Sequence, residues 1–155
     1  MATRSDFDAD ETMATLSKGI SNGLNKITLS LQKRIRKKLS KPGSGKMYGK
    51  HQASAPGEPP ANKSGNLINS WTSAKIRGPI KTKGSLKAAM GPANIGGSAK
   101  YAWALEYGHE FSNRTLLPRP YVKPSILMLE KGNRAGRIMQ NQLDRAIKEA
   151  NRRVD

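Results

Sequence analysis

A run of apolar residues at helical spacing constrains the fold of this chain more than any other feature. Eight apolar side chains recur at steps of three and four, which places them in one stripe along a helix from residue 8 to residue 39. They are Met13, Leu16, Ile20, Leu24, Ile27, Leu31, Ile35 and Leu39. Gly19 and Gly23 lie within this helix and are expected to weaken it. At the rise of an α-helix it would be a rod of roughly 45 Å, so we expect one end to project or to pack on a neighbour.

A second apolar stripe predicts a long helix near the other end of the chain, over residues 124–152. Pro124 suits its first turn, and Gly132 and Gly136 predict a bend or a close helix contact. The residues expected on its inner face are Ile126, Leu129, Met139, Leu143, Ile147, Ala150 and Val154.

The residues between the two helices predict an extended loop followed by a small sheet and a short helix. Residues 41–65 contain four Pro and five Gly in 25 positions and predict no regular element. Within residues 66–122, a helical turn capped by Ser64 precedes two strands, WTSAKIR and SLKAAMG, which the basic turn GPIKTKG joins. A short helix capped by Ser98 and closed by Gly108 follows, and then an extended loop. We therefore predict one α+β domain over residues 1–155, with a small antiparallel sheet between two long helices.

The composition indicates that this domain completes its core against partners, or remains partly unstructured when alone. Leu, Ile, Val and Phe together make up 27 of the 155 residues, and the net charge is +17. Residues 41–100 hold ten Lys or Arg and one acid, Glu58. Such basic loops are either a solvated surface or a surface that faces nucleic-acid phosphates without reading bases. The candidates for contact with DNA are Lys41, Lys46, Lys50, Lys81, Lys83 and Lys87.

The residue pattern argues against an enzyme, a cofactor site or a metal site. The chain has no cysteine, and GSGKM at residues 43–47 lacks the first glycine and the final hydroxyl of a phosphate-binding loop. His51 and His109 have no metal-ligand spacing, and no nucleophile lies in a recognisable triad. The acidic N-terminal stretch is unlike a signal peptide and no apolar run is long enough to span a membrane, so we expect the cytoplasm or a particle assembled there.

Five of the eight aromatic residues fall in the stretch YAWALEYGHEFSNRTLLPRPYVKP, residues 101–124. Acidic Glu106 and Glu110 accompany these rings, whereas stacking platforms for nucleic acid combine rings with basic residues. Charge and aromatic rings are therefore segregated, which favours one surface for a polyanion and another for protein. The rings fill the core of this domain or join an adjacent subunit, and Glu106 is a candidate partner for Arg119 across such a contact.

Three motifs between the two predicted helices resemble a family of phage tail components. ASAPGEPPANKSGNLINSW at residues 53–71, YAWALEYG at 101–108 and LPRPYVKPSI at 117–126 are similar, in this order, to the gene-ten-product family of lambdoid tailed bacteriophages, also described as tail-completion or neck proteins. Glu106 and Gly108 match the Y-A-x-x-L-E-Y-G element, and Arg119, Pro120, Tyr121 and Pro124 match the proline-rich element. The segment HEFSNRTLLP between the two elements is longer and more polar than the family pattern.

The resemblance implies a small α+β subunit without catalytic role or cofactor, in a ring of six that joins the tail to the head. Its expected partners are copies of itself, the connector or head-closure protein, the tail terminator or tail tube protein, and the genomic DNA in the channel. The protein would be located in the virion, after assembly in the host cytoplasm. A basic, non-sequence-specific nucleic-acid-binding protein is the alternative. The candidate subunit-interface residues are Tyr101, Trp103, Glu106, Tyr107, Arg119, Tyr121, Pro56, Pro59 and Pro60.

Overall fold

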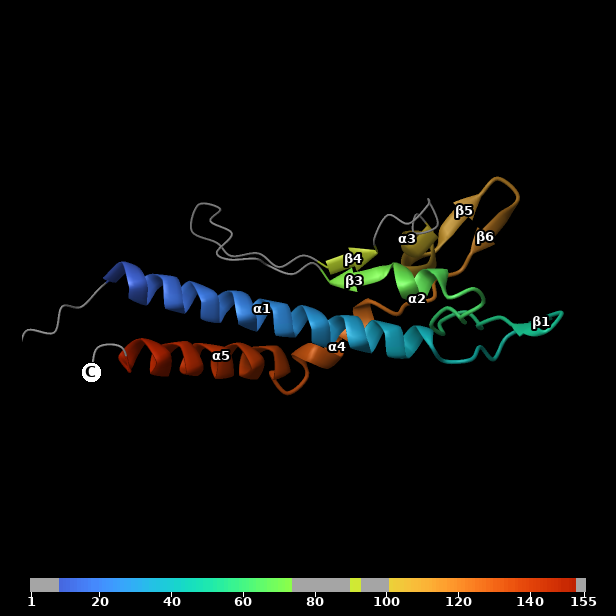
Figure 1. Cartoon of the computed structure of the whole chain (residues 1–155). Helices are drawn as coiled ribbons and strands as arrows, with labels where there is room; N and C mark the ends of the chain where they lie inside the picture. Colours follow the sequence, from blue (N-terminus) through green and yellow to red (C-terminus); the bar gives the residue numbers. More distant parts are fainter. Residues whose placement is uncertain (1–8, 74–89, 93–100, 153–155) are drawn as a thin grey trace, which may run out of the picture. The chain divides into compact units, whose positions relative to one another are not determined.

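The structure is a computed structural model that describes residues 9–73, 90–92 and 101–152 (Figure 1). It confirms the α+β class, with long N-terminal and C-terminal helices and small antiparallel sheets. The chain divides into two compact units. The first unit is formed by residues 1–29, 74–89 and 132–155, and the second by residues 30–73 and 90–131. The prediction of a single domain stays a prediction.

Two helices form the described part of the first unit, and they meet through small residues. They are the N-terminal part of α1 (Ala9–Leu39) and α5 (Arg134–Asn151). A Cβ atom added to Gly19 would lie 2.6 Å from the Ala146 Cβ, and one added to Gly23 would lie 2.6 Å from the Met139 Sδ. The order of these contacts makes the two helices antiparallel.

Gly19 and Gly23 have a second role, which the sequence did not predict. Gly19 and Gly23 are buried where α5 approaches, because the absence of a side chain lets the two backbones come close. By contrast, Met13, at the start of the predicted apolar stripe, is exposed, and Leu16 and Ile20 are only half-buried. The stripe is fully buried only at its end, at Ile35 and Leu39 in the second unit.

The helix predicted for residues 124–152 is not continuous, because the chain forms two helices there. Helix α4 (Lys123–Glu130) has Pro124 in its first turn, as predicted. The chain then leaves helical geometry, with positive φ angles of 71° at Gly132 and 50° at Asn133, before α5 begins. Of the predicted inner face, Leu129 and Ala150 are buried, whereas Ile126 and Ile147 are exposed.

The second unit is built around a small core of four buried residues: Ile35, Leu39, Trp71 and Tyr121. The rings of Trp71 and Tyr121 meet edge to face, with centroids 5.8 Å apart. The Gln32 side chain donates to the Trp71 carbonyl at 2.7 Å and ties α1 to this core. Five partly buried side chains pack around it: Leu31, Leu67, Ile68, Leu105 and Val122.

Short elements of the second unit bring distant parts of the chain to this core. Helix α2 (Asn66–Ser70) leads directly into strand β3 (Trp71–Ser73), which pairs antiparallel with β4 (Met90–Pro92). These strands agree with part of each predicted strand, and the remainder, with the basic turn and Ser98, lies outside the described residues. Helix α3 (Tyr101–Tyr107) is confirmed, and Gly108, with φ 81°, closes it.

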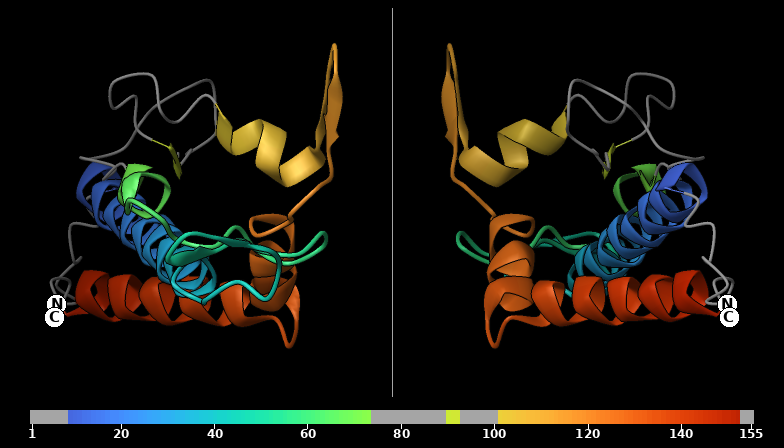
Figure 2. Two further views of the ribbon diagram at one scale, coloured as in Figure 1. Left: turned by 90° about the vertical axis from the view of Figure 1, so that its right-hand side faces the viewer. Right: turned by 90° about the vertical axis from the view of Figure 1, so that its left-hand side faces the viewer.

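Two further antiparallel hairpins lie where loops were predicted. Strands β1 (Met47–Tyr48) and β2 (His51–Gln52) pair within the Pro- and Gly-rich segment. Strands β5 (His109–Phe111) and β6 (Arg114–Leu116) pair within the segment HEFSNRTLLP. Figure 2 shows this second hairpin extending from the end of α3. The polar composition concealed both hairpins, because neither buries an alternating apolar face.

Candidate interaction surfaces

Glu106 holds the proline-rich segment against α3 from inside the second unit. Its side chain is only 6% exposed. Its carboxylate oxygens accept backbone N–H groups from Tyr121, Val122 and Lys123 at 2.8, 2.9 and 2.8 Å. These amides lie at the start of α4, where backbone N–H groups lack partners within the helix and the dipole favours a negative charge. Glu106 therefore fixes the entry of the chain into α4.

The expected pairing of Glu106 with Arg119 is not what the structure contains. Within the chain, Arg119 donates a side-chain N–H to the Ser54 carbonyl at 3.3 Å, while its backbone N–H donates to the Leu105 carbonyl at 2.7 Å. Glu106 is buried and already accepts three hydrogen bonds. Glu106 therefore stabilises the fold of the second unit, because three backbone amides occupy its carboxylate.

Tyr121, another predicted interface residue, is buried inside the second unit. It is 0% exposed, and its hydroxyl donates to the Ala102 carbonyl at 3.4 Å. Burial raises the pKa of the Tyr121 phenol above its ordinary value, because the charged phenolate would lose its hydration. The ring is thus a neutral core group and offers no surface to a neighbour.

The other rings of the aromatic stretch form an exposed face on α3. Trp103 and Tyr107 are 69% and 64% exposed, and their rings stack at 5.1 Å with an angle of 19°. Their spacing of four residues places both rings on one face of the helix, which allows them to stack. Tyr101 is also exposed, as is Phe111 on the neighbouring hairpin. We call Tyr101, Trp103 and Tyr107 the α3 aromatic face.

A second carboxylate organises the Pro- and Gly-rich segment. Glu58 accepts the Ser44 hydroxyl at 2.6 Å and the backbone N–H groups of Ser44 and Ala55 at 3.2 and 3.0 Å. The hydrogen bond from the Ser44 hydroxyl, followed by those from the two amides, lowers the pKa of Glu58 below its ordinary value. At Gly43 a Cβ would lie against the Ala53 carbonyl, so this position requires glycine.

The three candidate prolines of this segment lie at different depths. Pro56 is exposed, Pro59 is half-buried and Pro60 is buried. Pro60 also lines a cavity of about 340 Å³ that lies within the second unit. The depth of Pro60 shows that the segment packs on its own unit at this point.

Three of the six candidate DNA-contacting lysines can be placed. Lys41, Lys46 and Lys50 are exposed on the segment that includes β1 and β2, and the Lys46 ammonium lies 5.8 Å from the centre of the Tyr48 ring. Lys81, Lys83 and Lys87 lie outside the described residues.

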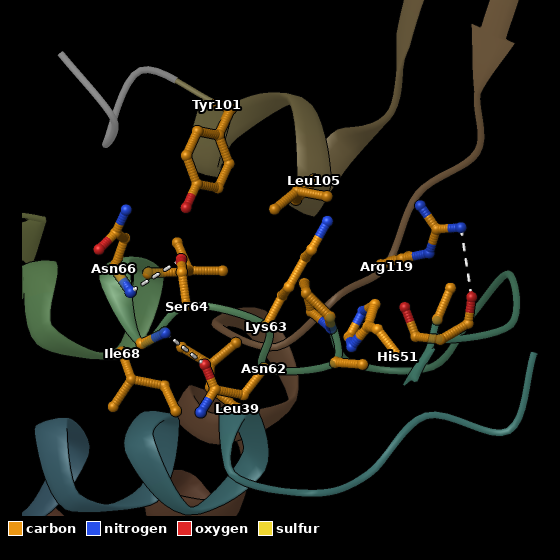
Figure 3. Close-up of a pocket in the computed structure, with 16 residues that line it drawn as sticks. Leu39, His51, Asn62, Lys63, Ser64, Asn66, Ile68, Tyr101, Leu105 and Arg119 are labelled. Atoms are coloured by element: carbon orange, nitrogen blue, oxygen red, sulfur yellow. Dashed lines mark hydrogen bonds between the residues drawn. The ribbon is translucent and has the colours of Figure 1, made fainter. Parts of the chain in front are cut away.

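A cavity of about 340 Å³ lies in the second unit, between the end of α1, the Pro-rich segment, α2 and α3 (Figure 3). Leu39, Ile68 and Leu105 form apolar parts of its wall. The polar and basic side chains around it are His51, Asn62, Lys63, Ser64, Asn66, Tyr101 and Arg119. None of the described residues that line it is Asp or Glu. Sequence reasoning missed this cavity, because its residues come from four separated segments.

The described part of the chain contains no group of three or more His, Asp or Glu residues that could hold a metal ion. Within the same residues, no helix is long and apolar enough to cross a membrane. Searches with protein-family models, among curated proteins and among solved structures found no match to this chain.

Proposed function

We propose that this chain is a structural virion protein of a tailed phage, a tail-completion or neck subunit that forms a ring around the passage for DNA. The α3 aromatic face carries the proposal. Trp103 and Tyr107 are large rings held at 69% and 64% exposure on a short helix that Glu106 anchors from the buried side. Exposed aromatic clusters on a rigid support are typical of protein–protein interfaces, where Trp and Tyr are the residues that contribute most to affinity.

The order of three sequence motifs supports the same proposal. The Glu106 and Arg119–Tyr121 elements, by which the chain resembles the phage family, are also the elements that contact one another in the second unit. The small core fits a subunit that completes its burial in an assembly.

The net charge of +17 supports a position next to DNA in this assembly. Lys41, Lys46 and Lys50 are exposed and would be repeated around a ring. Lysine contacts to phosphate hold DNA without sequence preference, as a channel for a moving genome requires.

The oligomeric state of the full chain tests the proposal. We expect a ring by size-exclusion chromatography with light scattering, and we expect Trp103→Ala with Tyr107→Ala to reduce it to smaller species. Tyr48→Ala is a matched control, because Tyr48 is 61% exposed but lies on β1 and not on α3. A ring that survives the double substitution would remove the α3 aromatic face from the interface.

The alternative, a basic nucleic-acid-binding protein, gives a different result in the same measurement. Its signature is a monomer that binds DNA tightly at moderate salt, with an affinity that falls as Lys41, Lys46 and Lys50 are changed to Glu. In the ring proposal, these charge changes leave ring formation intact and impair genome retention or ejection by the phage. Unchanged infectivity would remove the DNA-channel role.

A further inference from the structure

The cavity of the second unit has the chemistry to bind an apolar side chain that is accompanied by carboxylates. Part of its wall is apolar and is formed by Leu39, Ile68 and Leu105 (Figure 3). Positive charge at the wall comes from the side chains of Lys63 and Arg119. The Nε of Arg119 is buried and has no hydrogen-bond partner among the residues that the structure describes. A buried donor without a partner is costly, so an added acceptor near it would be favourable.

Three places in the sequence put an aromatic residue directly beside an acid. They are Asp6-Phe7-Asp8, Glu106-Tyr107 and Glu110-Phe111. Glu106 is excluded because it is buried and bound by three amides.

Phe111 is the weaker of the two remaining candidates, because its ring already has partners. It packs edge to face on His109 at 4.7 Å, and the Arg114 guanidinium lies 5.5 Å from its centre. Asp6-Phe7-Asp8 places one ring between two carboxylates, which matches a cavity with an apolar wall and two cationic side chains.

The reach of the chain decides which copy could supply this segment. Leu39, at the end of α1, lines the cavity, and α1 is one helix of 31 residues from Ala9 to Leu39. At about 1.5 Å per residue, this helix separates its two ends by roughly 45 Å. Residues 1–8 can span at most about 29 Å when fully extended. The segment therefore cannot return to the cavity at the far end of its own α1.

We propose that the cavity of the second unit binds the Asp6-Phe7-Asp8 segment of a second copy of this chain. Phe7 enters between Leu39, Ile68 and Leu105, and the two aspartates pair with Lys63 and Arg119. A contact of this kind is head-to-tail, because one copy donates its N-terminal segment and receives another in its cavity. Head-to-tail contacts build rings when the rotation closes. The inference thus rests on the proposed homo-oligomer and names one of its contacts.

Peptide binding tests the cavity separately from ring formation. The probe is a fluorescent peptide of residues 3–9, and the receptor is the full chain with Phe7→Ala, so that its own segment does not compete. We expect saturable binding by fluorescence polarisation, and we expect Lys63→Glu in the receptor to weaken it by about tenfold, since it reverses one of two paired charges. Circular dichroism of each receptor checks that it is folded.

Three controls separate this site from simple attraction to a basic protein. Lys131→Glu changes an exposed lysine of the same unit that does not line the cavity, and it should alter binding less than about twofold, as expected for a distant screened charge. A scrambled peptide of equal composition should bind weakly, and so should the peptide with Phe7→Ala.

Several results of these measurements would contradict the inference. Equal weakening by Lys63→Glu and Lys131→Glu, equal binding of the scrambled peptide, or no binding would overturn the inference. If a peptide of residues 108–113 bound more tightly than the peptide of residues 3–9, the β5–β6 hairpin would be the occupant of the cavity. This result would also overturn the inference. A ring that forms normally with Lys63→Glu would leave the proposed function intact while removing this contact. Peptide binding by a chain that stays monomeric would remove the ring and retain the cavity as the site.

Discussion

The two units of this chain compensate for few large apolar side chains in different ways. In the first unit, α1 and α5 approach closely because Gly19 and Gly23 face Ala146 and Met139. In the second unit, the carboxylates of Glu106 and Glu58 collect backbone amides from loops around a small core. The close approach of two helix backbones gains dispersion contacts without large side chains. A carboxylate accepts hydrogen bonds from several backbone amides that short helices and strands leave unpaired. The first unit should therefore be sensitive to added volume, and the second to lost charge.

The largest expected effect is on the second unit, from Glu106→Ala. This change removes the acceptor of three backbone amides, which belong to Tyr121, Val122 and Lys123. At about 1–3 kcal/mol for each buried group left unpaired, the free energy of unfolding should fall by about 3 kcal/mol or more. Urea unfolding followed by tryptophan fluorescence measures it, because Trp71 and Trp103 both lie in the second unit.

Glu110→Ala is the control for this prediction. Glu110 follows four residues later and is exposed, so the loss should stay within about 0.5 kcal/mol. Glu106→Gln should fall between the two, since an amide keeps one acceptor oxygen. Equal urea midpoints for Glu106→Ala and Glu110→Ala would show that the amides find other partners.

The next largest effect is expected in the first unit, from Gly19→Ala. Alanine is favoured over glycine in a helix by about 1 kcal/mol. Here, however, the new Cβ would lie 2.6 Å from the Ala146 Cβ and 3.3 Å from the Gln142 carbonyl oxygen. Forcing the two helices apart should cost about 1–3 kcal/mol. Hydrogen exchange of the α5 amides measures this loss locally.

Gly23→Ala tests whether a flexible neighbour on α5 reduces the cost of an added methyl group. The added methyl group would meet the Sδ and Cε atoms of Met139, which can move by rotating the side chain. We expect this variant to lose less protection than Gly19→Ala. Asn22→Ala, at an exposed position on the same helix, should be neutral or slightly stabilising. A Gly19→Ala chain as well protected as Asn22→Ala would refute the close helix contact.

A smaller and local effect is expected from acid in the second unit. The folded-state pKa of Glu58 is lowered, so its contribution is fully present above the unfolded pKa of about 4.3 and is lost as the pH falls through the lower folded value. Exchange of the Ser44 and Ala55 amides should therefore accelerate below about pH 4, beyond the intrinsic pH dependence of exchange.

Glu58→Gln tests the origin of this acid response. It should remove the additional acceleration, since the side chain no longer titrates, and it should lower the protection of both amides at neutral pH. The same response to acid in wild type and Glu58→Gln would assign it to another group.

The smallest effect is expected from Trp103→Ala in the isolated chain. Trp103 is 69% exposed and stacks on Tyr107 rather than on the core. We expect the free energy of unfolding to change by less than about 0.5 kcal/mol. A loss above about 1 kcal/mol by urea unfolding would place this ring within the subunit fold.

Local patterns predicted the helices, although not their partners. The apolar spacing around Ile35 and Leu39, Pro124 in the first turn of α4 and Gly108 after α3 all act over a few residues, and the structure confirms them. The break at Gly132 was expected only as a bend, because the positive φ angles of Gly132 and Asn133 are a backbone conformation that apolar periodicity does not report. The β5–β6 hairpin was missed, since its residues are almost all exposed and carry no alternating pattern.

The candidate site residues also differ in whether local sequence could predict their place in the structure. Aromatic composition pointed to Trp103 and Tyr107, and their spacing of four residues on α3 is enough to stack them. Residue type and sequence neighbours do not distinguish Tyr121, Glu106 and Arg119 from residues of an interface. They contact partners 15 to 65 residues away within the chain, so their burial could not be inferred from neighbours in sequence.

By itself, the sequence determined which segments are helical, although not the break between α4 and α5. It also determined the strong positive charge, the scarcity of core residues and the segregation of acids from basic loops. Each of these is a local or summed property of residue types. Only the tertiary structure decided that two glycines form a helix contact, that Glu106 binds three amides, and that segments from residues 39 to 119 line one cavity. The physical reason is that packing and hydrogen bonding depend on which distant groups meet.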